Sequence, residues 1–145
     1  MAHPRSVLVR ASRELALRAL YAADLCGDSP LELLRQNAVT VRDGVECPGG
    51  ANSLAIERLE NLSARSEEID TIVQEASPRW KIARMAVVDR NILRIGVYEL
   101  LQAQIPPKDV IFDCVELARQ YGDKDSYRFV NGLLDQVCKN REIAL

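Results

Sequence analysis

The sequence predicts an all-α fold, and three observations support that prediction. Apolar residues recur at three- and four-residue spacing along nearly all of the 145-residue chain, which is the period of helices that bury one face. No alternating apolar run bounded by turn residues is present, so a sheet is not expected. The composition, 48% hydrophobic and 28% charged, is typical of one ordinary soluble domain, and no apolar run approaches the ~20 residues of a membrane helix.

The amino-terminal part, about residues 1–76, is expected to contain three helices. The first runs from about Pro4 to Leu25 and ends at Gly27; its apolar stripe is formed by Val7, Leu8, Ala11 and Leu15. A short helix capped at 28–30 extends to about Asn37, and a loop rich in Gly, Pro and polar residues follows. One long helix is then expected from about Ser53 to Ala76.

The carboxy-terminal part, about residues 77–145, is expected to form a compact bundle because its loops are short. A short helical segment is expected around Trp80. A strongly apolar helix from Val87 to Ala103 should lie at the centre of the core. The next helix ends at Tyr121 with Gly122 as its C-cap, and Asp125 or Ser126 caps the last one.

The charge is distributed unevenly although its sum is only -2. Residues 1–23 carry Arg5, Arg10, Arg13 and Arg18 against Glu14, residues 24–75 are strongly acidic, and residues 76–145 are mildly basic. On the first helix, Arg10 and Arg13 point away from the apolar stripe and Arg5 lies near the edge of that arc. A modest anion-binding surface is therefore possible, whereas binding of nucleic acid by bulk charge alone is not expected.

The sequence lacks the patterns that would indicate an enzyme, a cofactor or a metal site. There is no phosphate-binding loop, no dinucleotide-binding glycine motif and no nucleophile elbow. The only histidine, His3, is too close to the terminus to serve as a general base, and Glu67-Glu68 are typical of a solvated helix face. Four dispersed cysteines do not form a zinc motif: Cys114 and Cys138 are expected in the core, and Cys47 exposed. Without a secretory signal, the chain is expected in the cytoplasm.

Ligand binding is the class of function that remains, and the turn before the last helix is a candidate binding site. Tyr121 and Phe129 flank a glycine turn with Lys124 and Arg128 close by, so the aromatic rings can stack on a base while the cations hold a phosphate. The same residues can equally be a helix end and core packing, and the first-helix arginines can be a solvated face. Composition alone does not separate these interpretations.

Three segments resemble the NusB family of transcription antitermination factors. They are RELALRALY at 13–21, VDRNILRIGVYEL at 88–100, and CVELARQYG at 114–122 continuing through Ser126 to FVNGLLD at 129–135. The resemblance spans nearly the whole chain and is weakest across 28–53. It implies about seven helices in two subdomains.

The resemblance also implies a function. NusB proteins pair with NusE, a small-subunit ribosomal protein, bind the single-stranded boxA element of nascent ribosomal RNA, and help RNA polymerase read through terminators. Carried over to this sequence, the RNA-binding residues are Arg5, Arg10, Arg13, Tyr121, Lys124 and Phe129. Asp89 and Tyr21 match positions near the NusE interface.

The first helix departs from the family because apolar residues are interspersed with its arginines, as in RSVLVRASR at 5–13. Fewer neutralised phosphates weaken RNA binding, so we expect the protein alone to bind RNA weakly and a basic NusE to complete the site. Two alternatives stay open: a scaffold that binds NusE but not RNA, and a homodimer through Val7 or Val9 that covers the arginines. NusB-like domains also occur in rRNA cytosine methyltransferases, which need a following cofactor-binding domain that a chain ending at Leu145 leaves no room for.

Overall fold

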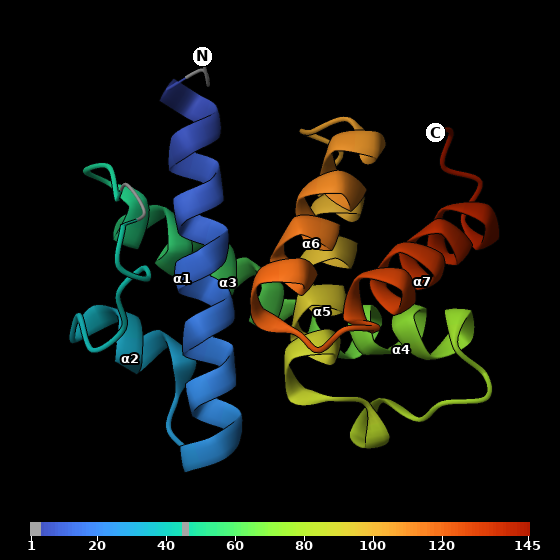
Figure 1. Ribbon diagram of the computed structural model, residues 1–145, viewed down its shortest axis with the longest axis horizontal. Coiled ribbons are helices and arrows are strands. Elements are labelled where there is room, and N and C mark those ends of the chain that lie inside the picture. Colours follow the sequence, from blue (N-terminus) through green and yellow to red (C-terminus); the bar gives the residue numbers. More distant parts are fainter. Residues whose placement is uncertain (1–3, 45–46) are drawn as a thin grey trace. The chain divides into compact units, whose positions relative to one another are not determined.

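The computed structural model describes the backbone of residues 4–44 and 47–145, and the side chains within these ranges from Val7 onward. Over these residues the chain forms seven α-helices and one short 3-10 helix, without a strand, as the sequence predicts. It divides into two compact units, Met1–Ala64 and Arg65–Leu145. The elements of both units are shown in Figure 1.

The first unit consists of α1 (Pro4–Cys26), α2 (Pro30–Arg35) and α3 (Ala51–Ala64), which pack on one another. Gly27 ends α1 with a φ of 77°, a left-handed conformation that glycine adopts without steric cost. Ser29 caps α2 by accepting a hydrogen bond from the Glu32 N–H at 3.4 Å. The core between these helices is apolar, formed by residues such as Leu15, Leu34, Ala55 and Leu59.

The segment between α2 and α3 is irregular where it is described, and two side-chain contacts support this region. Arg42 Nε donates to Glu14 Oε1 of α1 at 3.0 Å, and this carboxylate side chain is 6% exposed. Asn52 Nδ2 donates to the Leu34 carbonyl at 2.8 Å. Val45 and Glu46 lie outside the described residues. The first contact fastens the irregular segment to α1, and the second joins α3 to α2 directly.

The prediction of a single helix from Ser53 to Ala76 is wrong, because the structure has two helices there. α3 ends at Ala64 and α4 (Ser66–Ala76) begins after a single intervening residue, Arg65, at φ -114° and ψ 18°. Glu67 and Glu68 occupy the first turn of α4, where the helix dipole favours carboxylates, and Arg65 bonds both oxygens of Glu68 at 3.0 Å. The two units therefore divide at residue 64 instead of the boundary near 76 that the sequence suggested.

The second unit is built around α5 (Val87–Gln102), as expected from its apolar sequence. This helix contacts α4, α6 (Pro107–Tyr121) and α7 (Ser126–Asn140). Gly96 permits this close packing, since a Cβ there would lie 3.0 Å from Leu134 Cδ1 and 3.1 Å from Cys114 Sγ. Cys114 and Cys138 are buried and Cys47 is exposed, which confirms the three predictions.

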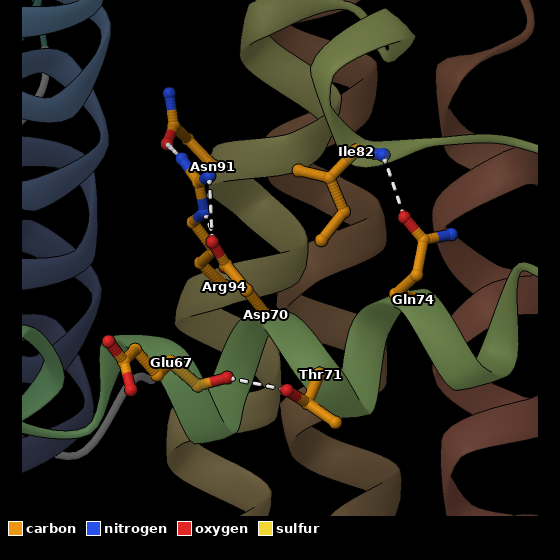
Figure 2. A network of polar contacts seen from close by, with 7 residues as sticks. All are labelled: Glu67, Asp70, Thr71, Gln74, Ile82, Asn91 and Arg94. Carbon is orange, nitrogen blue, oxygen red and sulfur yellow. Dashed lines mark hydrogen bonds and ion pairs between the residues drawn. The ribbon is translucent and has the colours of Figure 1, made fainter.

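A polar network ties α4 to α5 within this unit (Figure 2). Arg94 binds both oxygens of Asp70, with Nε to Oδ1 at 2.9 Å and Nη2 to Oδ2 at 3.2 Å, and its Nη1 donates to Asn91 Oδ1 at 3.0 Å. A planar guanidinium suits this two-pronged carboxylate contact. Arg94 thus fixes α5 on α4 at the VDRNILRI motif.

The connection from α4 to α5 differs in detail from the prediction. Its short helix is the 3-10 helix η1 (Ile82–Arg84), and Trp80 precedes it in a bend. No helix in the described part of the chain has the length and apolar character needed to cross a membrane.

Candidate nucleic-acid interface

The first-helix arginines do not share one environment. Arg10 is exposed, whereas Arg13 is 2% exposed and engaged with other residues. Both interpretations of Arg13, as an RNA contact and as part of a solvated face, required an accessible side chain, and the burial of Arg13 contradicts that requirement. A helical wheel gives direction around the axis but not what packs there. The side chain of Arg5 lies outside the described residues. Among the arginines predicted to bind RNA here, only Arg10 is described as exposed.

The turn between α6 and α7 (residues 122–125, orange in Figure 1) is fixed by reciprocal hydrogen bonds. Asp123 Oδ1 accepts from the N–H groups of Asp125 at 2.8 Å and Ser126 at 3.1 Å. In return, Ser126 Oγ accepts from the Asp123 N–H at 3.0 Å. This arrangement is a capping box. Asp125 occupies the N-cap position, as one of the two predictions had it, but its side chain makes no cap hydrogen bond, and Asp123 supplies that bond instead.

Gly122 is the C-cap of α6, as predicted, but for a reason other than left-handed backbone. Its φ is -91°, which any residue can adopt. A Cβ at this position would instead collide with the side chain of Ser126 and lie 2.8 Å from the Ala118 carbonyl oxygen. The absence of a side chain therefore lets the capping box close against the end of α6.

This rigid turn carries the remaining residues predicted to bind RNA. Lys124 is exposed at its centre, while Tyr121 and Phe129 are half-buried on the helices that flank it. Partial exposure suits either interpretation of the rings, since a half-buried ring can pack inward on one face and present the other. The turn brings a cation and two aromatic side chains into one short stretch of structure.

A second aromatic group near this turn was not predicted. Tyr127 has the guanidinium of Arg119 4.1 Å from its ring centroid and that of Arg128 at 5.4 Å, and Arg128 Nε lies 2.9 Å from the tyrosine hydroxyl. Arg119 also pairs with Glu116 at 3.5 Å. The sequence gives no signal for this cluster, because the contact between Arg119 and Tyr127 crosses the turn and depends on how α7 leaves it.

The two residues expected at a protein interface also differ in environment. Tyr21, on α1, is 40% exposed, whereas Asp89, in the first turn of α5, is 7% exposed. Burial raises the pKa of Asp89; a hydrogen bond with Ser126 opposes this rise, and the charge of Asp123 adds to it. Its Oδ1 has no hydrogen-bond partner within the described chain. Asp89 therefore lies beside the capping box.

Comparison with known proteins identifies the family. A family model described as the NusB family matches residues 10–139. This chain belongs to the NusB family. It is 39% identical over 136 residues to the transcription antitermination protein NusB of Geotalea daltonii, covering 90% of this chain and 94% of that protein.

Solved NusB structures have the same fold. T. maritima NusB superimposes with a TM-score of 0.78 at 29% identity, covering 96% of this chain and 93% of that one. A structure of the antitermination factors NusB and NusE in complex with double-stranded RNA gives a TM-score of 0.74 at 30% identity, covering 95% and 99%. The resemblance and the all-α fold inferred from the sequence are thereby confirmed, whereas the individual RNA and partner residues remain predictions.

Proposed function

We propose that this NusB-family protein is a non-enzymatic transcription antitermination factor. It binds boxA-type single-stranded RNA of the ribosomal leader together with NusE and joins the antitermination complex of RNA polymerase. A role on nascent transcripts places it in the cytoplasm. The support comes from relatives named as transcription antitermination proteins and from the fold it shares with a NusB crystallised with NusE and RNA.

The observation that carries the proposal on this chain is the α6–α7 turn. Its capping box and Gly122 fix the backbone, so Lys124, Tyr121 and Phe129 are presented with little further backbone ordering cost. Single-stranded RNA is recognised by aromatic side chains that stack on unpaired bases and by cations that follow the phosphates. We assign Tyr121 and Phe129 to base contacts and Lys124 and Arg10 to phosphates, with Arg5 as a further phosphate candidate.

Partner binding is assigned to Tyr21 and Asp89. Asp89 is the less accessible of the two, and its contact with Ser126 connects the first turn of α5 to the capping box. We therefore propose that Tyr21 touches NusE directly and that Asp89 supports the RNA-binding turn as well as the partner surface.

The test is binding to a short boxA-like RNA with and without NusE at two salt concentrations. Tight, salt-sensitive binding only in the presence of NusE is expected, because the described part of α1 offers few exposed cations. Lys124→Ala and Arg10→Ala should each weaken binding and reduce the slope of log K against log salt by about 0.7, the value for one phosphate contact to a single strand. Lys139→Ala, which removes an exposed cation of α7, is the matched control.

A scaffold that binds NusE without RNA is the second candidate, and the burial of Arg13 favours it by removing one cation from the surface. Association with NusE that persists while neither salt condition gives RNA binding would establish the scaffold. The homodimer alternative needs accessible apolar side chains on α1, and Val7 and Val9 are both partly exposed. Sedimentation that shows only monomer at high concentration would exclude it.

A further inference from the structure

Trp80 lies in an exposed basic segment that connects α4 to α5. Its side chain is 60% exposed, although tryptophan is a residue that proteins usually bury. Arg79, Lys81 and Arg84 surround it in sequence and are all exposed, and residues 76–88 contain no carboxylate. We refer to residues 77–85 as the Trp80 loop (yellow-green in Figure 1).

The Trp80 loop is held in one conformation by the side chain of Gln74. Gln74 Nε2 donates to the carbonyls of Ser77 at 2.8 Å and Trp80 at 2.9 Å, and its Oε1 accepts from the Ile82 N–H at 3.2 Å, as Figure 2 shows for Ile82. Ser77 Oγ donates to the same Trp80 carbonyl at 3.3 Å. One amide on α4 therefore fixes the backbone on both sides of the tryptophan.

Backbone hydrogen bonds complete the Trp80 loop. The Trp80 N–H bonds the Ser77 carbonyl at 3.2 Å, and the Met85 N–H bonds the Ile82 carbonyl at 3.0 Å. Met85 is 7% exposed and anchors the end of the loop in the interior. The loop thus presents a large indole from an ordered backbone, which lowers the entropy lost when a ligand binds.

We propose that the Trp80 loop is a second single-stranded RNA site, which takes nucleotides outside the boxA element. An exposed indole offers a face on which an unpaired base can stack, and nearby cations can neutralise the phosphates on either side. Among the described residues, none of Arg79, Lys81 and Arg84 is in an ion pair, so their charges are available to a polyanion. The proposal rests on the RNA-binding function proposed above, which it extends from the boxA element to the flanking transcript.

Charge favours RNA over an apolar protein partner for this surface. The segment combines three cations with one aromatic side chain, and its other exposed residues are small or proline: Pro78, Ala83 and Ala86. A protein-binding hot spot would need a surrounding apolar patch that excludes water. A polyanion with unpaired bases needs only cations and an exposed aromatic ring to bind, and the Trp80 loop has both.

The experiment compares two RNAs bound to the complex with NusE. One is the short boxA-like RNA, and the other carries in addition an unstructured extension of about eight nucleotides, within the range that a single-strand site covers. We expect the extended RNA to bind more tightly, and Trp80→Ala to reduce that gain about tenfold while leaving the short RNA unaffected. Trp80→Phe should retain most of the gain, because the phenyl ring still stacks.

Two further variants test whether the loop's charges contribute to RNA binding and whether the effect of Trp80→Ala is specific to this aromatic side chain. Arg79→Ala combined with Lys81→Ala should reduce the salt dependence of the extended RNA by about 1.4 in log–log slope, the value for two single-strand phosphates. Phe112→Ala is the matched control, since this α6 side chain is also 60% exposed. It should leave both affinities unchanged.

Trp80 is the only tryptophan, so the fluorescence of the protein without NusE reports this loop directly. At RNA concentrations high enough for the weak binding expected without NusE, the extended RNA should quench it, and the short RNA should not. Equal affinities of the two RNAs, an equal loss from Phe112→Ala, or quenching by NusE alone would overturn the proposal, the last in favour of protein contact. If the complex fails to bind even the short RNA, the proposed function itself fails, which is a different result.

Discussion

The two surfaces proposed to bind RNA, on α1 and at the α6–α7 turn, are built in different ways. On α1 the arginines are spread along one helix, and their accessibility depends on what packs around that helix: Arg10 is exposed and Arg13 is buried. At the turn, Lys124 is exposed because the capping box of Asp123 and Ser126 holds the backbone in place. One surface depends on side chains along a helix, and the other on the local structure of a turn.

A cation in a family motif is therefore not necessarily a ligand-binding cation. A buried guanidinium costs free energy unless its hydrogen bonds are satisfied, so such a residue acts mainly on the fold. A residue in a well-capped turn can be assigned to binding with more physical support, because the local hydrogen bonds determine its exposure. Three substitution experiments test this comparison.

The largest effect is expected at α1, from Arg13→Ala compared with Arg10→Ala. Loss of the buried Arg13 side chain leaves its neighbours without their partner and should lower the free energy of unfolding by about 3 kcal/mol or more. Arg10→Ala should change it by less than about 0.5 kcal/mol, as is usual for an exposed residue, while weakening RNA binding by the complex. Urea unfolding and RNA titration of both variants provide the measurement.

The comparison would fail if the two variants were equally stable. Equal stability would mean that Arg13 is not buried when the protein is in solution. The sequence-based prediction that Arg13 contacts phosphate would then be supported. Retained stability together with lost RNA binding in Arg13→Ala would have the same meaning.

A smaller effect is expected at the turn, from Gly122→Ala. The added methyl group would meet the side chain of Ser126 and the Ala118 carbonyl, so the capping box must shift, at a cost of about 1–3 kcal/mol typical of overpacking. RNA affinity should fall as well, because Lys124 and Tyr121 move with the turn. Thermal unfolding and RNA titration test both expectations.

Gly132→Ala is the matched control for this change. Gly132 lies within α7, and a Cβ there would meet nothing within 4 Å. Alanine should therefore stabilise the helix by about 0.5–1 kcal/mol. A loss of stability from Gly132→Ala similar to that from Gly122→Ala would show that the turn is not special.

The smallest effect concerns pH and Asp89. Its pKa is raised in the folded state, chiefly by burial, so the folded protein holds this proton more tightly than the unfolded chain does. As pH rises above the ordinary value of 3.8, the unfolded chain loses the proton first, and stability is lost until the pH passes the raised pKa. Asp89→Asn has no such proton, so its stability relative to the wild type should increase from about pH 3 to about pH 7.

Urea unfolding of the wild type and of Asp89→Asn at the two pH values gives the difference between their free energies of unfolding. The contributions of all other carboxylates cancel in this difference. The groups beside Asp89 are Ser126 and Asp123, and the asparagine amide can keep a hydrogen bond to the serine. A difference that is constant or falls with pH would mean that ion–dipole stabilisation in the first turn of α5 outweighs burial.

Much of the fold was predictable because it depends on local chemistry. Gly27, the proline that begins α2, and the apolar sequence of α5 each act through neighbours in sequence, and the corresponding elements agree with the structure. The break at Arg65 was not predictable from periodicity, since apolar spacing continues through both α3 and α4. The sequence placed the N-cap of α7 at Asp125 but did not indicate that Asp123 supplies the side-chain bond, because several acceptors stand close together in GDKDS.

The candidate site was predictable only in part. The sequence located Tyr121, Lys124 and Phe129 at one turn, and the structure describes an exposed lysine and two half-buried rings there. The sequence did not indicate that Arg119 stacks on Tyr127 or that Gln74 hydrogen-bonds the Trp80 carbonyl. Each contact crosses the end of a helix, where helical periodicity no longer predicts which residues meet.

The helical class of this protein, the ends of most helices and membership of the NusB family could be inferred from the amino-acid sequence, because periodicity, caps and motifs are encoded in short stretches of chain. Which polar side chains are buried became clear only from the folded structure. Arg13, Glu14 and Asp89 are ionisable residues in an environment that water hardly reaches. The physical reason is that desolvation depends on every atom around a group, and those atoms come from segments that only the folded chain brings together.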